Sequence, residues 1–287
     1  MPVALPLLGG FALGLAFRAL LQRHFAHVFR THFALGMGTL AVLAGWGFHA
    51  DLGAIAALGL LLVAQLTSLG IGSRLFRDDR EGPVMAFGMF GNPTFWALPI
   101  VAATLGADAA VVLAAYDMLT MPRIALGVRL MRGREPVPQT PRTALTDYAP
   151  MLGAVSGLLL ARVVPAPDVV PELVAGLGLF LSVTGAMLLG VAWPRGRWAG
   201  RAELRGTART LALHFSFVPA VLGAGALAGL HVPPGVWFLV LGPLPISTLS
   251  FARVYGYSDR QAATGLAVSI AAAVALLPLA LALARAG

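Results

Sequence analysis

The chain contains no cysteine and no lysine, and it is poor in charge of either sign. Of its 287 residues, 11% are charged and 58% are hydrophobic, and the mean hydropathy is +0.84. The absence of cysteine excludes disulfides, thiolate metal sites and cysteine nucleophiles. A soluble domain carries about 25% charged residues. The composition therefore predicts an integral membrane protein.

All 20 basic residues are arginine, and the formal net charge is +8. Such a charge can indicate a nucleic-acid partner, but these arginines lie in short loops between apolar runs and form no continuous basic face. Their placement fits the rule that basic residues gather in the cytoplasmic loops of membrane proteins. We therefore expect no nucleic-acid partner.

We interpret ten apolar runs as transmembrane helices. They fall at residues 2–17, 33–50, 52–71, 84–105, 109–128, 149–164, 169–192, 207–230, 236–254 and 260–283. The loops after the odd-numbered runs hold most of the arginines, whereas the opposite loops hold only Arg162. This bias predicts a multi-pass protein of the inner (plasma) membrane with both termini outside the cytoplasm. The first run is read as a retained span, because its arginines follow the apolar stretch instead of preceding it.

The polar stretch at 129–148 contains three prolines and reads as a cytoplasmic linker between two halves of five spans each, 1–128 and 149–287. Because five is odd, the second half begins on the opposite side of the membrane. Any internal repeat is then an inverted one. The fold class that we expect is an all-α polytopic membrane protein made of two inverted five-helix repeats.

A faint sequence signal supports such a repeat. Gly91 precedes Asp108 by the same number of positions that separate Gly242 from Asp259. On this offset, Gln65 of span three corresponds to Ser216 of span eight.

Two spans carry a break near their middle. Span four contains Gly91-Asn92-Pro93-Thr94, and span nine contains Gly242-Pro243-Leu244-Pro245. Proline lacks the N–H that an unbroken helix needs and disfavours the helical conformation of the preceding residue. At mid-membrane the freed backbone groups are costly unless they line an enclosed cavity. Two interrupted spans in corresponding halves point to the binding site of a transporter. The alternative is a pair of ordinary proline kinks without a ligand.

If the two breaks meet in space, they favour an anion. The second half-helix of each span then directs its N-terminus, with free N–H groups and a partial positive charge, toward the middle of the membrane. The predicted site suits a small anion or carboxylate and requires no metal or cofactor. The candidate substrate-binding residues are Asn92, Pro93, Thr94, Pro243, Pro245, Ser247 and Thr248.

Other polar residues inside the spans are candidates for the pathway or for coupling. Asp117 lies near the middle of span five, where a carboxylate is costly and serves either proton coupling or a structural hydrogen bond. Gln65 and Ser216 either line the pathway or join helices by hydrogen bonds. His32 is expected in a solvated loop or at an interface and not at a metal site. His214 either lines the pathway or coordinates a coupling ion, or it has a structural role near the wet cytoplasmic end of its span.

A family resemblance rests on residues around both breaks. These are Phe90-Gly91-Asn92, Leu98-Pro99, Leu105-Gly106 and Tyr116-Asp117 in the first half, and Pro243-Leu244-Pro245-Ile246-Ser247, Phe251-Ala252, Tyr255-Gly256 and Asp259 in the second. In this order and spacing, the chain resembles the auxin efflux carrier family of the bile-acid and auxin carrier superfamily.

The resemblance implies that spans four and nine cross at their breaks beside the substrate. It implies a scaffold of spans one, two, six and seven, which also forms a homodimer contact, and a transport domain of spans three to five and eight to ten. It further implies transport of organic anions of the carboxylate class by an elevator-like motion.

The functional hypothesis is a secondary carrier of a small organic anion, driven by the anion's gradient or by protons. The alternatives are a sodium-coupled symporter of the bile-acid type and a channel or ligand-sensing protein on the same scaffold. The sequence contains no nucleophile–base pair, metal-ligand cluster or ATP-binding motif, so we expect neither an enzyme nor a primary pump.

Overall fold

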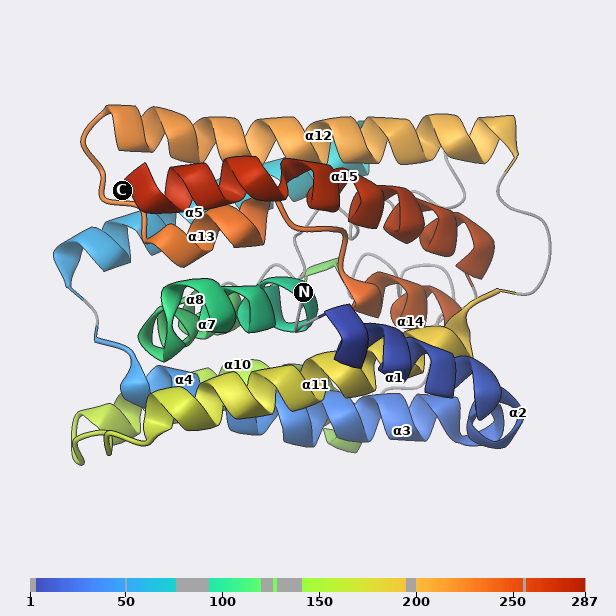
Figure 1. The fold of residues 1–287 in the computed structure, drawn as a ribbon, viewed down its shortest axis with the longest axis horizontal. Helices are drawn as coiled ribbons and strands as arrows, with labels where there is room; N and C mark the ends of the chain where they lie inside the picture. Colours follow the sequence, from blue (N-terminus) through green and yellow to red (C-terminus); the bar gives the residue numbers. More distant parts are fainter. Residues whose placement is uncertain are drawn as a thin grey trace. The chain divides into compact units, whose positions relative to one another are not determined.

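A computed structural model describes residues 4–49, 51–75, 93–119, 126–127, 141–194, 200–254 and 257–286. These residues are overwhelmingly helical, and none of them forms a β-strand (Figure 1). Five helices are long and apolar enough to cross a membrane, namely Arg18–Gly47, Leu52–Leu75, Val170–Ala192, Leu204–Leu227 and Asp259–Ala286. The prediction of an all-α membrane protein is thereby confirmed. The count of ten spans and the inverted repeats stay predictions.

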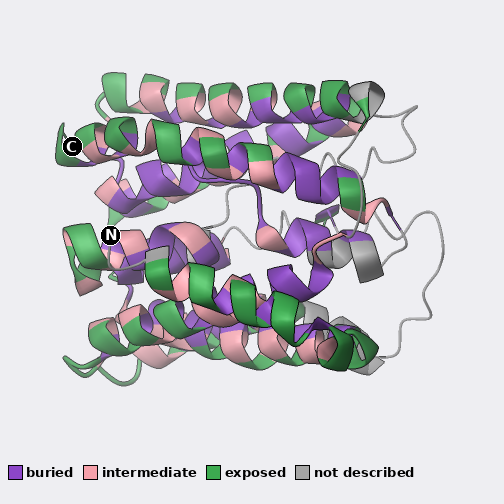
Figure 2. Ribbon diagram, turned by 45° about the vertical axis from the view of Figure 1, so that its right-hand side comes forward, coloured by how far each residue is buried: buried purple, intermediate pink, exposed green. Residues whose placement is uncertain are grey.

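The exposed surface of the helices is itself apolar, as contact with lipid requires. In the helices Leu204–Leu227 and Asp259–Ala286, only 22% of the most apolar stretch is buried. Large hydrophobic side chains such as Leu8, Phe180 and Val274 are exposed. Figure 2 shows exposed residues along the outer faces of the long helices, with buried residues on their inner faces.

Contacts within the chain define two compact units, which are described separately. Unit 1 comprises Met1–His49, Pro93–Pro122 and Pro136–Ala192, and unit 2 comprises Ala50–Asn92, Arg123–Glu135 and Trp193–Gly287. Unit 1 thus takes in most of predicted spans one, two, five, six and seven and the second part of span four. The predicted division into scaffold and transport domain, with repeats at 1–128 and 149–287, stays a prediction.

Unit 1 is built from segments of both halves of the chain. Its elements are α1 (Ala4–Ala16), α2 (Arg18–Leu21), η1 (Gln22–His24), α3 (Phe25–Thr31), η2 (His32–Met37), α4 (Gly38–Gly47), η3 (Pro93–Ala97), α7 (Leu98–Leu105), α8 (Ala107–Leu119), α10 (Pro141–Ala161) and α11 (Val170–Ala192). Two long helix pairs dominate its packing, because α1 runs along α11 and α4 runs along α10.

Glycines let the helices of these two pairs approach closely. A Cβ atom at Gly10 or Gly14 of α1 would collide with backbone carbonyls of α11. A Cβ atom at Gly153 or Gly157 of α10 would likewise collide with carbonyls of α4. Small residues at helix contacts are the usual means of tight association in membranes, where dispersion forces replace the hydrophobic effect.

The arginine-rich stretch after the first span is helical, and the expectation of a loop there was wrong. The helix Arg18–Gly47 is nearly continuous through α2, η1, α3, η2 and α4. Phe25, Phe29 and Phe33 are about 5–6% exposed, and their rings stack in sequence with centroids 6.2 and 6.0 Å apart. Residues four apart lie on one face of a helix. The buried aromatic face therefore stabilises this helix. The sequence analysis did not predict the helix, because polar residues lie between the phenylalanines.

The predicted linker at 129–148 is also partly helical. Helix α10 begins at Pro141, a residue suited to the first turn because its missing N–H would have no partner there. Residues 129–140 lie outside the described part of the chain.

Unit 2 contains α5 (Leu52–Leu75), α12 (Arg201–Leu227), α13 (Pro234–Val240), α14 (Ile246–Val254) and α15 (Asp259–Ala286). Helix α15 contacts α12, α13 and α14, and α12 packs along α5. Figure 1 shows α13 and α15 side by side beneath α12. All the residues of the segment between α13 and α14 are buried.

Candidate functional site

The clearest irregular feature of unit 2 is the break between α13 and α14. Helix α13 ends at Val240 and α14 begins at Ile246, and residues 241–245 between them are not helical. This is the position at which Pro243 and Pro245 predict an interruption, because neither has an N–H to continue the helix. The segment is buried, so its backbone polar groups need partners inside the protein.

Side chains from two other helices supply those partners. Nε2 of His214, on α12, lies 2.7 Å from the carbonyl oxygen of Gly242. The N–H of Leu244 donates to Oγ of Ser269, on α15, at 3.0 Å. The Ser269 hydroxyl in turn donates to the carbonyl of Leu266 at 2.7 Å. A carbonyl only accepts hydrogen bonds, so Nε2 is the nitrogen of His214 that carries the hydrogen.

His214 differs from its sequence-based expectation. It was expected near the wet end of its span, but it is only 2% exposed and its ring meets Phe215 edge-on at 4.6 Å. The sequence did not single out Ser269, which is fully buried. The available signal was a polar residue inside an apolar span, which is a functional candidate by default because its burial is costly.

The start of α14 carries polar groups that the helix itself does not bond. The N–H of Thr248 bonds to the carbonyl of Pro245 at 2.9 Å, and the N–H groups of Ile246 and Ser247 precede the first intrahelical acceptors. Thr248 is 3% exposed, and among the described residues no group lies within hydrogen-bond reach of its Oγ1. Ser247 beside it is also buried. The first turn of this helix therefore combines a partial positive charge with an available hydroxyl.

Other buried hydroxyls of unit 2 behave differently. The hydroxyls of Thr210 and Thr264 donate to the carbonyls of Gly206 and Arg260, four residues earlier, at 3.2 and 2.9 Å. Such back-bonding is the usual solution for a threonine in a helix. Thr248 does not use it, and its hydroxyl is left for another partner.

Of the first break, in predicted span four, the structure describes only the residues from Pro93 onward. Asn92 and the segment before it lie outside the described residues. Pro93 and Thr94 begin the π-helical segment η3, which leads into α7, and the side chain of Thr94 is likewise outside the described set. Single π-helical turns occur frequently at functional sites.

Segment η3 packs against α11 and faces His32 of η2. Phe95 is buried, and a Cβ atom at Gly185 of α11 would overlap its ring. The ring of His32 stacks on Phe95 with centroids 5.8 Å apart, and its Nδ1 lies 3.3 Å from Oγ1 of Thr184. His32 is therefore half-buried in a helix and contacts neighbouring elements, so of the two expected surroundings the structure shows contacts between helices and not a solvated loop.

The candidate binding residues fall into two groups. Pro243, Pro245, Ser247 and Thr248 lie together in unit 2 at the break and the first turn of α14. Pro93 and Thr94 belong to η3 in unit 1. The expected crossing of the two breaks stays a prediction.

The pathway candidates lie on three different helices and differ in burial. Asp117 is buried on α8 in unit 1, next to Tyr116, whose ring meets Phe48 edge-on at 6.1 Å. Gln65 is buried on α5 in unit 2. Ser216 lies on an exposed part of α12 and donates to the carbonyl of Ala212 at 2.6 Å.

The buried face of α12 carries two polar residues besides His214, namely Thr207 and Thr210, which the sequence analysis missed. The three residues are spaced so that they share one side of the helix. Oγ1 of Thr207 has no hydrogen-bond partner among the described residues, and this side chain lies next to Gly265 of α15. Their helical spacing was the signal that could have identified this face.

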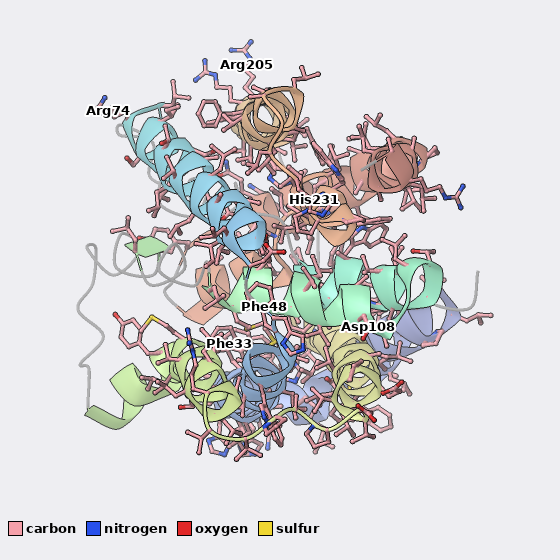
Figure 3. The ribbon with its side chains drawn as sticks, turned by 90° about the vertical axis from the view of Figure 1, so that its left-hand side faces the viewer. Phe33, Phe48, Arg74, Asp108, Arg205 and His231 are labelled. Carbon is pink, nitrogen blue, oxygen red and sulfur yellow. The ribbon has the colours of Figure 1, made fainter. Side chains whose placement is uncertain are left out.

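Exposed arginines gather at one end of unit 2. Helix α12 packs along α5 and runs in the opposite direction, as the colours of Figure 1 show, so Gly225, late in α12, lies against Leu60 in the first half of α5. The end of α5 at Arg74 and the start of α12 at Arg205 are therefore on the same side, and Figure 3 shows both side chains extending outward. His231, in the connection from α12 to α13, lies at the opposite end of α12.

The described residues contain no group of three or more histidine or acidic side chains arranged to hold a metal ion. The first N–H groups of α14 and the Thr248 hydroxyl can donate hydrogen bonds, which suits an anion or a polar neutral ligand. No protein-family model matches the chain, and none of the curated proteins matches it.

Proposed function

We propose that this protein is a secondary carrier that moves a small organic anion of the carboxylate class across the plasma membrane. The observation that carries the proposal is the start of α14, where a proline-enforced break precedes a helix N-terminus. The buried hydroxyl of Thr248 in its first turn has no hydrogen-bond partner within the described part of the chain. The auxin efflux carrier family, which the sequence resembles, would provide the mechanism, an elevator-like alternating access.

The electrostatics of this site favour a carboxylate. A helix N-terminus carries about half a positive elementary charge, and its first N–H groups point toward the ligand. The Thr248 hydroxyl can donate one further hydrogen bond to a carboxylate oxygen. A charged ligand inside the membrane domain is costly unless it is hydrogen-bonded, and these donors supply the bonds without a buried basic side chain.

The packing of unit 1 supports two inverted repeats. In such repeats span one corresponds to span six, and span two corresponds to span seven. If span one packs against span seven, the repeat therefore predicts that span six packs against span two. Helix α1 packs along α11, and α10 packs along α4. The glycine pair of α1, Gly10 and Gly14, matches the pair of α10, Gly153 and Gly157, in its spacing and in facing carbonyls of the partner helix.

The arginines of unit 2 support the proposed orientation. Arg74 and Arg205 lie at the same end of the α5–α12 pair, which the distribution of basic residues assigns to the cytoplasm. Both chain termini are then outside the cytoplasm. The proposed scaffold, homodimer contact and crossing of the two breaks rest on the family resemblance.

A ligand screen followed by transport assays tests the proposal. The purified protein is heated with acetate, benzoate or succinate at several pH values, and a bound anion raises the apparent melting temperature by mass action. Saturable counterflow of the same anion in proteoliposomes is then expected. Ohmic currents would indicate a channel instead, and a requirement for sodium would indicate a symporter of the bile-acid type.

Two substitutions connect that transport to the proposed site. Asn92→Ala is expected to abolish counterflow if its amide contacts the anion, and Asp117→Asn is expected to remove any dependence of uptake on a proton gradient. Unchanged uptake kinetics for Asn92→Ala would remove that residue from the site. If no carboxylate shifts the melting temperature or exchanges across the membrane, the proposed substrate class is wrong.

A further inference from the structure

We infer that His214 and Ser269 are positioning residues that hold the α13–α14 break in its ligand-binding conformation. This inference deepens the proposed function and rests on it for the identity of the ligand. It concerns two residues that contact the backbone of the break and not the anion itself.

The first argument is the cost of a break inside a membrane protein. Gly242 and Leu244 lie in a buried, non-helical segment, where water cannot satisfy their backbone groups. His214 provides the donor for the Gly242 carbonyl, and Ser269 provides the acceptor for the Leu244 N–H. A buried backbone group that loses its hydrogen-bond partner destabilises the conformation that buries it. The two side chains therefore stabilise the non-helical backbone of the break.

The second argument is competition with helix growth. If α14 extended backward by one turn, the Gly242 carbonyl would accept a hydrogen bond from the N–H of Ile246, four residues on. That N–H is one of the donors on which the proposed anion site depends. The bond from His214 instead draws the Gly242 carbonyl toward α12. Pro243 and Pro245 already oppose such growth, and His214 adds to their effect by engaging the Gly242 carbonyl, so the N–H of Ile246 stays available for a ligand.

The third argument separates positioning from ligand contact. The Ser269 oxygen accepts from Leu244 and donates to Leu266, so its hydrogen is already committed. Nε2 of His214 is likewise committed to Gly242. Thr248, by contrast, has a hydroxyl without a partner among the described residues. The break thus contains two residues that fix the backbone and one hydroxyl that remains for the anion.

Hydrogen–deuterium exchange of the ligand-free protein in detergent tests the positioning role directly. His214→Leu removes the donor at similar size, whereas His214→Gln retains an N–H donor. We expect His214→Leu and Ser269→Ala to accelerate exchange in peptides covering 241–250 by about tenfold. His214→Gln should exchange nearly as slowly as the unmodified protein. Exchange in α5 should not change in any of these variants.

Two control variants make the same chemical changes at exposed positions of unit 2. His231→Gln alters a histidine beyond the end of α12, and Ser216→Ala removes a hydroxyl that only back-bonds within α12. Neither should change exchange at the break. If His214→Leu leaves exchange at 241–250 unchanged, or raises exchange uniformly through unit 2, the positioning role is refuted.

Binding of succinate and benzoate provides the second readout. His214→Leu is expected to weaken the binding of whichever of these anions the unmodified protein binds, by about tenfold or more, and His214→Gln to restore it. Equal affinities for all variants would overturn the link to the ligand site. If the unmodified protein binds neither anion, the proposed substrate class fails, while the exchange measurements still decide whether His214 and Ser269 hold the break.

Discussion

At the scale of single residues, the buried hydroxyl groups of the apolar helices fall into two classes: those that bond to their own helix and those that do not. Thr210, Thr264 and Ser182 each donate to a carbonyl one turn earlier, which satisfies the hydroxyl without any other element. Thr248 and Thr207 are equally buried but have no such bond. A buried polar group without a partner destabilises a fold. The Thr248 hydroxyl, at the first turn of α14, is the group on which the proposed ligand site depends.

The first prediction concerns Thr248→Val, which removes the hydroxyl and keeps the shape of the side chain. We expect the affinity for a bound carboxylate to fall about tenfold, because a hydrogen bond to a charged group contributes about 1.5–3 kcal/mol. The melting temperature without ligand should stay the same or rise, because an unsatisfied buried group is removed. Calorimetric titration and thermal unfolding measure the two effects.

Thr264→Val is the matched control, since its hydroxyl already donates to the carbonyl of Arg260. It should leave the affinity for the carboxylate unchanged. If both variants lose affinity equally, or Thr248→Val loses none, then Thr248 does not contact the anion.

At the scale of elements, close helix contacts and an aromatic face decide the packing of unit 1. The glycines of α10 allow the carbonyls of α4 to approach, and the stacked rings of Phe25, Phe29 and Phe33 form one buried face of α3 and η2. Both features follow helical spacing in the sequence. The sequence does not show which helix either feature packs against, because that depends on the tertiary fold.

The second prediction compares two glycines of unit 1. In Gly157→Ala the new Cβ would collide with the carbonyl of Val42 on α4, so the α4–α10 pair must separate. We expect a loss of stability of about 1–3 kcal/mol, the usual cost of overpacking. Unfolding in detergent, followed by circular dichroism, measures it.

Gly176→Ala is the control, because a Cβ there meets nothing within 4 Å. It should be neutral or stabilise helix α11 by about 0.5–1 kcal/mol, since alanine favours a helix more than glycine does. Equal effects of the two substitutions would contradict the close contact between α4 and α10.

At the scale of the whole molecule, the absence of cysteine makes the orientation in the membrane testable. Arg74 and Arg205 lie at one end of the α5–α12 pair, and His231 lies at the other end of α12. From the distribution of arginines we propose that the first end is cytoplasmic.

The third prediction follows from that assignment. In intact cells or spheroplasts, a membrane-impermeant maleimide should label His231→Cys, whereas Arg205→Cys should react only after the membrane is permeabilised. The unmodified chain serves as the control, since it has no thiol to react. Labelling of Arg205→Cys from outside would reverse the orientation, and labelling of both positions from one side would contradict a membrane-spanning α12.

Much of the fold class could be predicted because it depends on local chemistry. High hydropathy and scarce charge identify a membrane protein, and Pro243 and Pro245 interrupt a helix wherever it packs. The helix through Phe25 and Phe29 was missed, although its four-residue spacing was visible, because arginines and histidines between the rings resembled a loop.

The amino-acid sequence by itself therefore determined the membrane class, the helical fold and the place where span nine breaks, because each follows from backbone chemistry or from transfer between water and lipid. Only the tertiary structure decided which side chains form hydrogen bonds with the backbone of that break. His214 and Ser269 come from helices distant in sequence, and they reach Gly242 and Leu244 through the rotation and packing of α12 and α15. Ser216 was chosen from its place in the sequence, but the rotation of α12 exposes it and buries His214 two residues away.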